Sequence, residues 1–580
     1  MKRKWLYLAL LLLLILPLWA GFQTMASGAR PLVKLAPAGA LVYLEAKDFS
    51  SLLKDWNASP EKAAWLKSDN YQVFSRSRLF LRLGDAQKEF TAAAGLPADM
   101  NLLAQVAGKE SAFAWYDIGK LEFLYITRGA PAGSSESLLG QNRSKFEVRS
   151  VGAQTFYLHR DPVSGRVAAF ASVGDYLVLA TREDLIAGAL QLLAGENVRS
   201  LDSEPWWARP AALAGEPGDL RMALNLEALV ASPYFRTYWV QRNVTDMKQY
   251  TAALCDLYRS GGEYREERIL LRRSAPEVPK SAAGARAASE LAAMAPSEAG
   301  LFRAAADPAV DDALAMLESR LLVPQPGGSE PRYRMAPASV KLAAANPEGA
   351  GDYETRIDQA PANRDAGQAD EELRRLLQGA GLQAVVEVHA TEAGADGVFV
   401  RSRAVIGLVA ASEWRLAEVQ SAMTAVLQRG LTAGQMGVTW KNNRAGYAEL
   451  DGLLPLAVAV RGKQVFIGND AALLMTMLGS PQRKPEVADA SYLAGFSHGR
   501  ERDNFLRLSR VVDRGVQSAA NPAPATPEGG MAEAGREPAF LSGNIGSLSG
   551  SLAGVTRERI TVRDQGETVR QSVVYSWATQ

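Results

Sequence analysis

The two halves of this 580-residue chain carry similar local patterns in the same order. Near the start of each half, an apolar stretch that follows a proline ends at an aspartate, Asp48 in the first half and Asp307 in the second. A helical spacing of leucines follows both aspartates, and aspartate is a preferred N-cap residue. Each segment therefore predicts a strand that leads into a helix capped by aspartate.

A second pair of matching segments lies in the middle of each half. Gly174 and Gly462 each separate two apolar runs, as expected for a tight turn between two strands. Thr181 and Asn469 end the second run of each pair, just before another helical pattern. Because both residue types favour N-cap positions, we expect them to cap these helices.

A third match closes the two halves, where Glu267–Arg272 resembles Glu558–Arg563. Three matches in the same order predict an α+β fold with two similar tandem domains, each with a mainly antiparallel sheet and packed helices. The alternative is that short strand and cap patterns recur by chance in any α+β protein.

The composition of the segments between these matches sets the predicted domain limits. Prolines and alanines follow the first half, and two stretches of the second half are rich in proline, glycine and alanine with little apolar periodicity. The predicted parts are a signal anchor or signal peptide at 1–29, a first domain at 30–273, a linker at 274–287, and a second domain at 288–580 with disordered insertions near 323–369 and 517–538.

The N-terminus has the pattern of an export signal. Lys2, Arg3 and Lys4 precede residues 5–22, which contain no charged residue. As a helix this apolar segment is about 27 Å long, near the hydrocarbon thickness of a bilayer, and its basic flank is expected to stay in the cytoplasm. The sequence therefore predicts an N-terminal transmembrane helix; the alternative is a cleaved signal peptide.

This segment also predicts where the rest of the chain lies. We expect a single-pass protein of a bacterial cytoplasmic membrane, contacted through residues 5–22, with the bulk of the chain outside the cytoplasm. If the signal is cleaved, the protein is periplasmic or secreted instead. Later apolar stretches are broken by Gly, Asp, Pro or Arg and predict strands.

Charge and cysteine content exclude several classes of function. The formal net charge is only +1, so no overall positive field favours nucleic acid as a partner. Cys255 is the only cysteine, which excludes an intrachain disulfide and a cysteine-based metal cage. Its apolar neighbours in the sequence favour a small buried side chain over a reactive thiol.

One short segment resembles the motifs of serine penicillin-binding enzymes. Ser59 and Lys62 form an S-x-x-K tetrad in which the lysine would activate the serine. No K-T-G strand accompanies it. The favoured interpretation is a helix start, with Ser59 as N-cap and Pro60 at the first helical position.

Other chemical signals are weak. His159, His389 and His498 are scattered singly, without a second histidine or cysteine at metal-ligand spacing, and no phosphate-binding glycine loop occurs. The sequence thus predicts no catalytic, cofactor-binding or metal-ligating residues, and no cofactor. The aromatic residues Trp206 and Trp207, with Tyr234, Phe235, Tyr238 and Trp239, are expected in a core, the alternative being a ligand or membrane platform.

Two segments resemble a known family. The stretch from Leu35 to Asp48, together with Gly174 to Asp184, is similar to an uncharacterised bacterial exported family labelled domain of unknown function 3352. This resemblance implies an exported, membrane-associated envelope protein, and it carries no catalytic residue across.

We therefore expect a non-enzymatic, membrane-anchored cell-envelope protein that binds or scaffolds through its tandem domains, with another protein, a lipid or a glycan as partner. The alternatives are an envelope serine hydrolase using Ser59 and Lys62, and a carrier of lipids or lipoproteins, which would need an apolar cavity.

Overall fold

The structure is a computed structural model, and it describes most of the chain after residue 29. The described residues are 30–129, 143–238, 247–276, 278–322, 371–393, 400–432, 438–451, 455–479, 485, 487–504 and 554–578. The predicted anchor at 5–22 and the predicted insertions near 323–369 and 517–538 lie outside them. The chain divides into two compact units, unit 1 (Met1–Ser50 and Gln87–Ala208) and unit 2 (Ser51–Ala86 and Arg209–Gln580).

Unit 1 is built on an antiparallel sheet with the strand order β1-β2-β3-β7-β6-β5-β4. Its strands are β1 (Val42–Lys47), β2 (Glu110–Asp117), β3 (Glu122–Arg128), β4 (Glu147–Val151), β5 (Gln154–Arg160), β6 (Val167–Val173) and β7 (Tyr176–Ala180). Gly174 forms the tight turn between β6 and β7 at a φ of 61°, a left-handed conformation that suits glycine.

Helices cover both faces of this sheet. Helix α8 (Glu183–Ala194) packs on β5, β6 and β7. Ala168 and Phe170 of β6 pack with Phe90 and Ala93 of α5 (Arg78–Ala94). Neighbouring residues of a strand point to opposite faces, and Ala169 and the other residues from Val167 to Ala171 are buried as well, so this strand is covered on both sides. Unit 1 further contains η1 (Leu32–Leu35), α6 (Met100–Val106), η2 (Arg143–Lys145), η3 (Leu201–Ser203) and the start of α9 (Pro205–Leu213).

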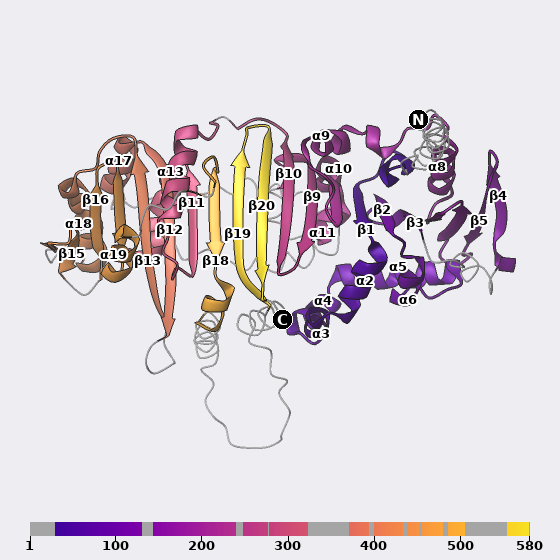
Figure 1. The fold of residues 1–580 in the computed structure, drawn as a ribbon, viewed down its shortest axis with the longest axis horizontal. Helices are drawn as coiled ribbons and strands as arrows, with labels where there is room; N and C mark the ends of the chain where they lie inside the picture. Colours follow the sequence, from indigo (N-terminus) through magenta and orange to yellow (C-terminus); the bar gives the residue numbers. More distant parts are fainter. Residues whose placement is uncertain are drawn as a thin grey trace, which may run out of the picture. The chain divides into compact units, whose positions relative to one another are not determined.

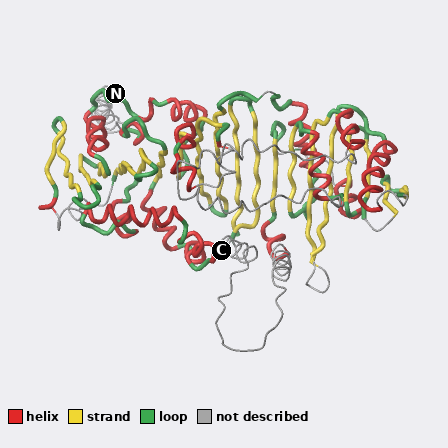
Figure 2. The backbone as a smooth tube through the Cα atoms, turned by 180° about the vertical axis from the view of Figure 1, so that it is seen from behind, coloured by secondary structure: helices red, strands yellow, loops and turns green. Residues whose placement is uncertain are grey.

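Unit 2 contains a longer antiparallel sheet, ordered β8-β9-β10-β20-β19-β18-β11-β12-β13-β17-β16-β15-β14. Its strands are β8 (Leu220–Asn225), β9 (Tyr250–Ser260), β10 (Glu263–Arg272), β11 (Leu301–Ala306), β12 (Leu382–Ala393), β13 (Val400–Ala410), β14 (Thr439–Asn442), β15 (Ala448–Asp451), β16 (Ala457–Arg461), β17 (Gln464–Gly468), β18 (Tyr492–Phe496), β19 (Val555–Asp564) and β20 (Thr568–Trp577). The C-terminal hairpin β19–β20 lies between β10 and β18 (Figure 1), and Figure 2 shows the row of strands from behind.

Two hydrophobic clusters fill the faces of the unit 2 sheet around β12 and β13. On one face, Ile406 and Leu408 of β13 pack with α14 (Val310–Arg320), α17 (Glu371–Ala380) and α18 (Leu416–Thr432). On the other, Val405 and Val409 of the same strand pack with α13 (Ala282–Ala293) and α19 (Ala471–Gly479). The alternation along β13 therefore produces three layers, helix, sheet and helix.

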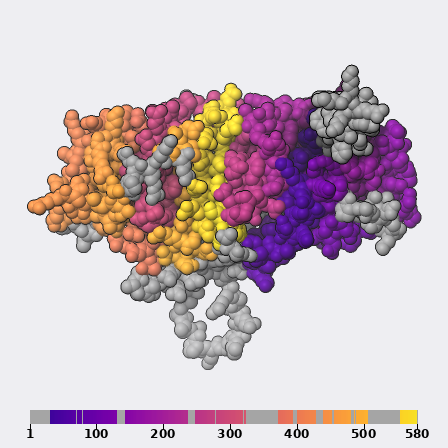
Figure 3. All heavy atoms as spheres, in the orientation of Figure 1, coloured from indigo at the N-terminus to yellow at the C-terminus, as the bar shows by residue number. Residues whose placement is uncertain are grey.

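The remaining helices of unit 2 are short. They are α2 (Phe49–Ala58, of which Ser51 onward belongs to unit 2), α3 (Pro60–Leu66), α4 (Asp69–Ser75), α10 (Leu226–Ala231) and α11 (Pro233–Tyr238). Strands β19 and β20 are mostly half-buried, and their yellow side chains reach the surface seen in Figure 3.

The predicted helix caps at Thr181 and Asn469 are wrong. The Thr181 hydroxyl accepts a hydrogen bond from the Phe123 backbone N–H, and the Asn469 carbonyl oxygen accepts one from the Ala404 N–H. Both residues thus bind the neighbouring strand, β3 or β13. Asp470 caps α19 instead, because its carboxylate accepts from the Leu473 N–H at 2.8 Å.

The predicted cap at Asp307 is also wrong. Asp307 adopts a left-handed backbone with a φ of 41°, and α14 begins three residues later with Ala309 as its N-cap. Asp48 has the same conformation, with a φ of 46°, and directly precedes α2. Both aspartates mark the point where the chain leaves a strand.

The fold class predicted from the sequence is confirmed in its main statement: the protein is α+β with a large antiparallel sheet. The boundaries of the compact units differ from those of the predicted domains, since residues 209–272 belong to the same unit as the second half of the chain. Part of the predicted linker, from Ala282, is helical. The part of the chain that the structure describes contains no helix long and apolar enough to cross a membrane.

Candidate functional site

A hollow of about 430 Å³ lies in unit 2 at the N-terminal end of α13. Three segments of the chain meet there, at the start of α13, before β18 and at the end of β19. Its wall is formed by Lys280, Ser281, Ala282, Ala285, Arg286, Ala488, Asp489, Ser491, Arg563, Asp564 and Gln565. Eight of these eleven residues are charged or polar, and the other three are alanines.

The start of α13 is already occupied by a carboxylate of the protein itself. The Ser281 hydroxyl accepts a hydrogen bond from the Gly284 N–H at 2.9 Å and donates one to Asp307 at 2.9 Å. The Asp307 carboxylate also accepts from the Ser281 N–H at 2.5 Å. Because a helix N-terminus attracts negative charge, Asp307 supplies the anion that this end of α13 favours.

The other charged groups of the hollow are mostly paired. Arg563 bonds to Asp489 at 2.9 Å, and Arg272 forms a two-point ion pair with Asp564. Burial raises the pKa of Asp564, but hydrogen bonds from Arg272 and the Gly566 N–H outweigh it, so this pKa lies below its ordinary value. Arg286 is exposed and has no ion-pair partner among the described residues. The charged groups of the hollow are therefore mostly bonded to other groups of the protein.

A second polar cluster lies on β12. The Glu387 side chain is fully buried, and its two oxygens accept hydrogen bonds from Arg303 of β11 and Arg320 of α14. Both arginines keep about two fifths of their side chains exposed, at 39% and 42%. A buried carboxylate needs such partners, because an unpaired buried charge is strongly destabilising.

Next to this carboxylate the structure brings together a serine and a histidine that the sequence analysis did not connect. His389 Nε2 lies 2.6 Å from the hydroxyl of Ser402 on β13. Burial lowers the pKa of His389, and the positive charge of Arg320 lowers it further. A neutral histidine beside a serine is the first requirement for an activated nucleophile.

The further requirements of that chemistry are not met in the described residues. A catalytic histidine needs a third group that orients its other nitrogen. The oxygens of Glu387 are bonded to the two arginines, and no other carboxylate of the described chain bonds to His389. Ser402 is exposed on its strand. The Ser402–His389 contact is thus a cross-strand hydrogen bond.

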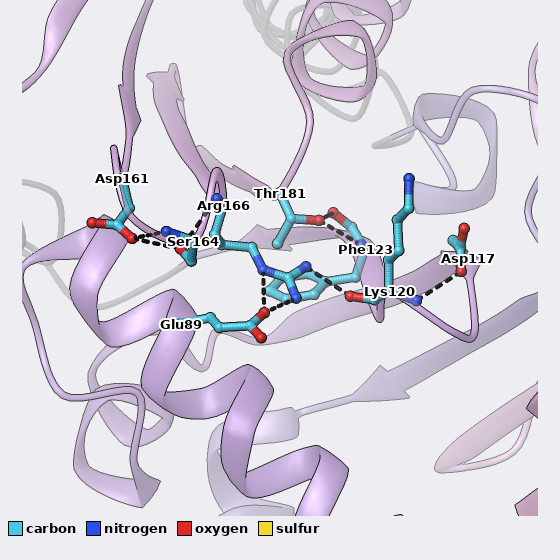
Figure 4. Close-up of polar contacts among 8 residues, drawn as sticks. All are labelled: Glu89, Asp117, Lys120, Phe123, Asp161, Ser164, Arg166 and Thr181. Atoms are coloured by element: carbon cyan, nitrogen blue, oxygen red, sulfur yellow. Dashed lines mark hydrogen bonds and ion pairs between the residues drawn. The ribbon is translucent and has the colours of Figure 1, made fainter. Parts of the chain in front are cut away.

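Unit 1 contains a polar clamp centred on Arg166 (Figure 4). The guanidinium is buried and bonds to the carboxylate of Glu89 on α5 and to the Lys120 carbonyl oxygen. The turn that leads to Arg166 is held by Asp161, whose carboxylate accepts from the Ser164 N–H at 2.7 Å. The clamp ties α5 to two turns of the sheet, which is a structural role.

The structure places Ser59 at a helix start, as predicted. Its hydroxyl accepts from the Lys62 backbone N–H at 3.2 Å and donates to the Trp56 carbonyl oxygen at 2.8 Å. The Lys62 amine bonds to Asn57 and not to Ser59. The S-x-x-K segment therefore lacks the serine–lysine contact that catalysis would need.

The three histidines have separate partners. His159 bonds to the Ala93 carbonyl oxygen at 2.7 Å in unit 1, and His498 approaches Glu558 at 3.4 Å in unit 2. Within the described ranges, no group of three or more His, Cys, Asp and Glu side chains could hold a metal ion. Trp206, Trp207 and Phe235 are buried, as predicted for core residues, at 9%, 5% and 8% exposure, whereas the prediction is wrong for Tyr234, which is 50% exposed.

The fold and the polar clusters together define the class of protein. It is an α+β protein whose large antiparallel sheets are stabilised by internal ion pairs. No family model matches the chain, and no curated protein matches it. Among solved structures the chain is similar to crystal form I of TP0453, with a TM-score of 0.24 and 11% identity over 43% of this chain and 82% of that one. Crystal form III of TP0453 has a TM-score of 0.25 and 10% identity over 43% and 83%.

Proposed function

We propose that this protein is a non-enzymatic, membrane-anchored protein of a bacterial cell envelope that binds or scaffolds through two similar tandem domains. The apolar residues 5–22 and the basic residues before them support the anchor, since this arrangement favours a membrane-spanning helix with the following chain outside. The resemblance to the exported family labelled domain of unknown function 3352 agrees with this placement.

The observation that carries the tandem arrangement is a common strand order. The order β1-β2-β3-β7-β6-β5-β4 in unit 1 has the same connectivity as β11-β12-β13-β17-β16-β15-β14 in unit 2. Special residues recur at corresponding positions. Asp48 and Asp307 share a left-handed backbone, and Thr181 and Asn469 make the same bond to the neighbouring strand. A duplicated sheet gives two copies of one surface, which suits a scaffold.

The proposal that the protein is not an enzyme is supported by the hydrogen bonds and ion pairs that its candidate reactive groups already make. Ser59 caps a helix, Asp307 binds the N-cap residue Ser281 of another, and Glu387 accepts hydrogen bonds from two arginines. Catalytic groups are instead poised toward a site where substrate can bind. The partner would be another envelope protein, a lipid or a glycan, and not nucleic acid.

The location can be tested with two reporters fused after Gln580 in bacterial cells. We expect alkaline phosphatase to be active in this fusion and green fluorescent protein to stay dark, because only the first folds outside the cytoplasm. The matched control replaces Lys2, Arg3 and Lys4 by glutamate, which should reduce phosphatase activity. A bright fluorescent fusion with an inactive phosphatase would overturn the proposal.

Retention and partner are tested separately. If residues 5–22 form an anchor, alkaline carbonate leaves the full-length chain in the membrane fraction, and the mass of the mature protein includes Met1 or Lys2. Chemical crosslinking in intact membranes should then join the tandem domains to a defined envelope component. Full release by carbonate with a shortened N-terminus would show a cleaved signal.

A further inference from the structure

The two sheets can be compared position by position along β1–β2 and β11–β12. Asp48 donates its N–H to the Lys109 carbonyl oxygen, and Asp307 donates its own to that of Gln383. Counted from these bonds, the register of β1 with β2 is the same as that of β11 with β12. Each residue of β1 and β2 therefore has a counterpart in β11 or β12.

At three adjoining positions the two copies carry opposite kinds of side chain. In unit 1 the residues are all apolar and are Leu44, Phe113 and Trp115, with the rings of the last two 4.3 Å apart. In unit 2 the counterparts, in the same order, are the charged or titratable residues Arg303, Glu387 and His389. Apolar residues in place of a buried ion pair often stabilise a protein. The polar set is thus not required by the fold, and such departures from core patterning are expected at functional sites.

Glu387 binds two arginines through one nitrogen each. The oxygens of its fully buried side chain accept hydrogen bonds from Nε of Arg303 and from Nε of Arg320, the second at 2.6 Å. The terminal nitrogens carry the other N–H donors of each guanidinium, and they make no hydrogen bond within the described residues. Two positive charges therefore share one negative charge, and both arginine side chains remain partly exposed.

Other acidic side chains of this region do not bind the two arginines. Glu318 lies two residues before Arg320 on α14, but neither arginine bonds to it in the described part of the chain. Glu501 is buried as well, and it accepts a hydrogen bond from Thr391, two residues beyond His389 on β12. Burial lowers the pKa of His389, and Arg320 lowers this pKa by more than Glu501 raises it. The terminal nitrogens of both arginines thus remain available to an anion from outside the described chain.

Neutral hydrogen-bonding groups lie on the same side of the sheet. Tyr492 of β18 pairs with Ala305, two residues from Arg303, so its side chain points to the same face. Its hydroxyl has no hydrogen-bond partner among the described residues, and the charge of Arg303 partly offsets the rise in its pKa that burial causes. On the other side of Glu387, His389 contacts Ser402. Strands β18, β11, β12 and β13 are neighbours (Figure 1), so these groups border the arginines.

We propose that the terminal nitrogens of Arg303 and Arg320 bind a phosphate group, with the Tyr492 hydroxyl as a further donor. Guanidinium groups match phosphate oxygens in two-point hydrogen bonds, which are stronger than neutral ones because they are charge-assisted. A carboxylate has only two oxygens, whereas a phosphate offers a third to the tyrosine. The inference rests on the proposed binding role and names its chemistry. A lipid headgroup and a free phosphate ion both carry this group, and the binding experiment separates them.

The test uses the full-length chain in a non-ionic detergent, with isotope-labelled histidines observed by NMR. Inorganic phosphate, added at constant ionic strength, should shift the signal of His389 and leave that of His159 in unit 1 unchanged. A bound phosphate offsets the positive charge of Arg320, so the pKa of His389 should rise. No shift of His389, or an equal shift of both histidines, would overturn the proposal.

Variants of Arg320 separate its charge from its hydrogen bonds. Arg320→Lys keeps a positive charge beside Glu387 but loses the planar set of N–H donors, so phosphate affinity should fall about tenfold in titration calorimetry. Arg320→Gln also removes the excess charge and should weaken binding further. The matched control is Arg415→Gln on α18, where the arginine side chain is 79% exposed, and it should bind phosphate like the unchanged protein.

Thermal unfolding without phosphate checks that each variant folds. Arg320→Gln leaves Glu387 with one arginine, whereas Arg320→Lys retains the counter-charge, so the lysine variant decides the outcome if the glutamine variant does not fold. Unchanged phosphate affinity in Arg320→Lys is incompatible with the proposed site.

The source of the phosphate is tested with glycerophosphoglycerol, the water-soluble headgroup of phosphatidylglycerol. Tighter binding of this probe than of inorganic phosphate supports a site for headgroups, and binding of inorganic phosphate alone supports a site for the free ion. Acetate that binds as tightly as phosphate would reject the phosphate assignment. These measurements do not depend on the location of the chain. A cytosolic reporter result therefore removes the proposed function and leaves a His389 response in place, whereas an exported chain without that response removes the phosphate site alone.

Discussion

Arg221 and Asp256 form a two-point ion pair inside unit 2, with both nitrogen–oxygen distances at 2.7 Å. Their side chains are 8% and 2% exposed, so the pair is removed from water. The Gly218 N–H donates to Asp256 at 3.1 Å, and Arg221 also donates to the Gly215 carbonyl oxygen at 3.1 Å. The pair thereby joins β8 and β9 to each other and to the loop that precedes β8.

Removing one charge of this pair should destabilise the protein strongly. Asp256→Asn leaves the buried Arg221 guanidinium without its counter-charge, and we expect a loss of about 3–5 kcal/mol in the free energy of unfolding. Urea unfolding followed by circular dichroism measures it. The control is Glu418→Gln in the exposed pair with Arg415, where the loss should stay below about 1 kcal/mol. Equal effects of the two variants would contradict the assignment.

Two glycine substitutions in helices should act in opposite directions. A Cβ at Gly284 of α13 would clash with the carboxylate of Asp307, so Gly284→Ala should cost about 1–3 kcal/mol. At Gly379 of α17 a Cβ meets nothing within 4 Å, and Gly379→Ala should stabilise by up to about 1 kcal/mol. Thermal unfolding of both variants checks the signs. A neutral Gly284→Ala would mean that the Asp307 carboxylate does not lie against the start of α13.

The Cys255 thiol should be unreactive in the folded protein. Burial, and next the negative charge of Glu266, raise its pKa to about 11. At pH 8 the thiolate is therefore only about a thousandth of the population, against about a quarter for an exposed thiol. Alkylation by iodoacetamide, followed by mass spectrometry, should be far slower in the native chain than in urea.

The same shift predicts a pH dependence of stability. The folded state disfavours the thiolate, so this contribution to stability is complete below the ordinary thiol pKa and is lost as pH rises toward 11. Cys255→Ala should remove this part of the alkaline destabilisation. Rapid alkylation of the native thiol at pH 8, or an unchanged alkaline profile in the alanine variant, would argue against a raised thiol pKa at the half-buried Cys255.

Ser59 should behave as a helix cap and not as a nucleophile. Ser59→Ala removes the bond to the Lys62 N–H and should lower the local stability of α3 by about 1 kcal/mol, measured by amide hydrogen exchange. Ser59→Asp should restore most of it. The native protein should not react with fluorescent penicillin or fluorophosphonate. Labelling that disappears in Ser59→Ala would instead support the hydrolase alternative.

The patterns that the sequence predicted correctly are those that depend on near neighbours. The cap at Ser59 follows from a serine and a proline side by side, and the turn at Gly174 from a glycine between two apolar runs. Sequence alone also favoured burial of Trp206 and Trp207, because aromatic pairs at helical spacing usually pack inward.

The partners of the polar residues were decided by tertiary structure. Asp307 binds Ser281, the N-cap residue of the preceding helix α13, because β11 returns beside that helix. His389 meets Ser402 only through the register of β12 and β13, and Glu387 receives arginines from two separate elements. For Glu387 the one sign in the sequence was a charged residue within an otherwise apolar strand. Such a residue needs a partner of opposite charge, but the sequence does not identify that partner.

The sequence by itself determined the α+β class, the duplicated order of strands and turns that we propose as tandem domains, and the apolar N-terminal segment, because backbone propensity, side-chain alternation and hydropathy act over a few residues. The tertiary structure alone decided which charges are buried together and which apolar side chains of α2–α5 stay in water. Those outcomes depend on contacts between residues far apart in the chain, and such contacts are fixed only when the strands pair and the helices pack on them.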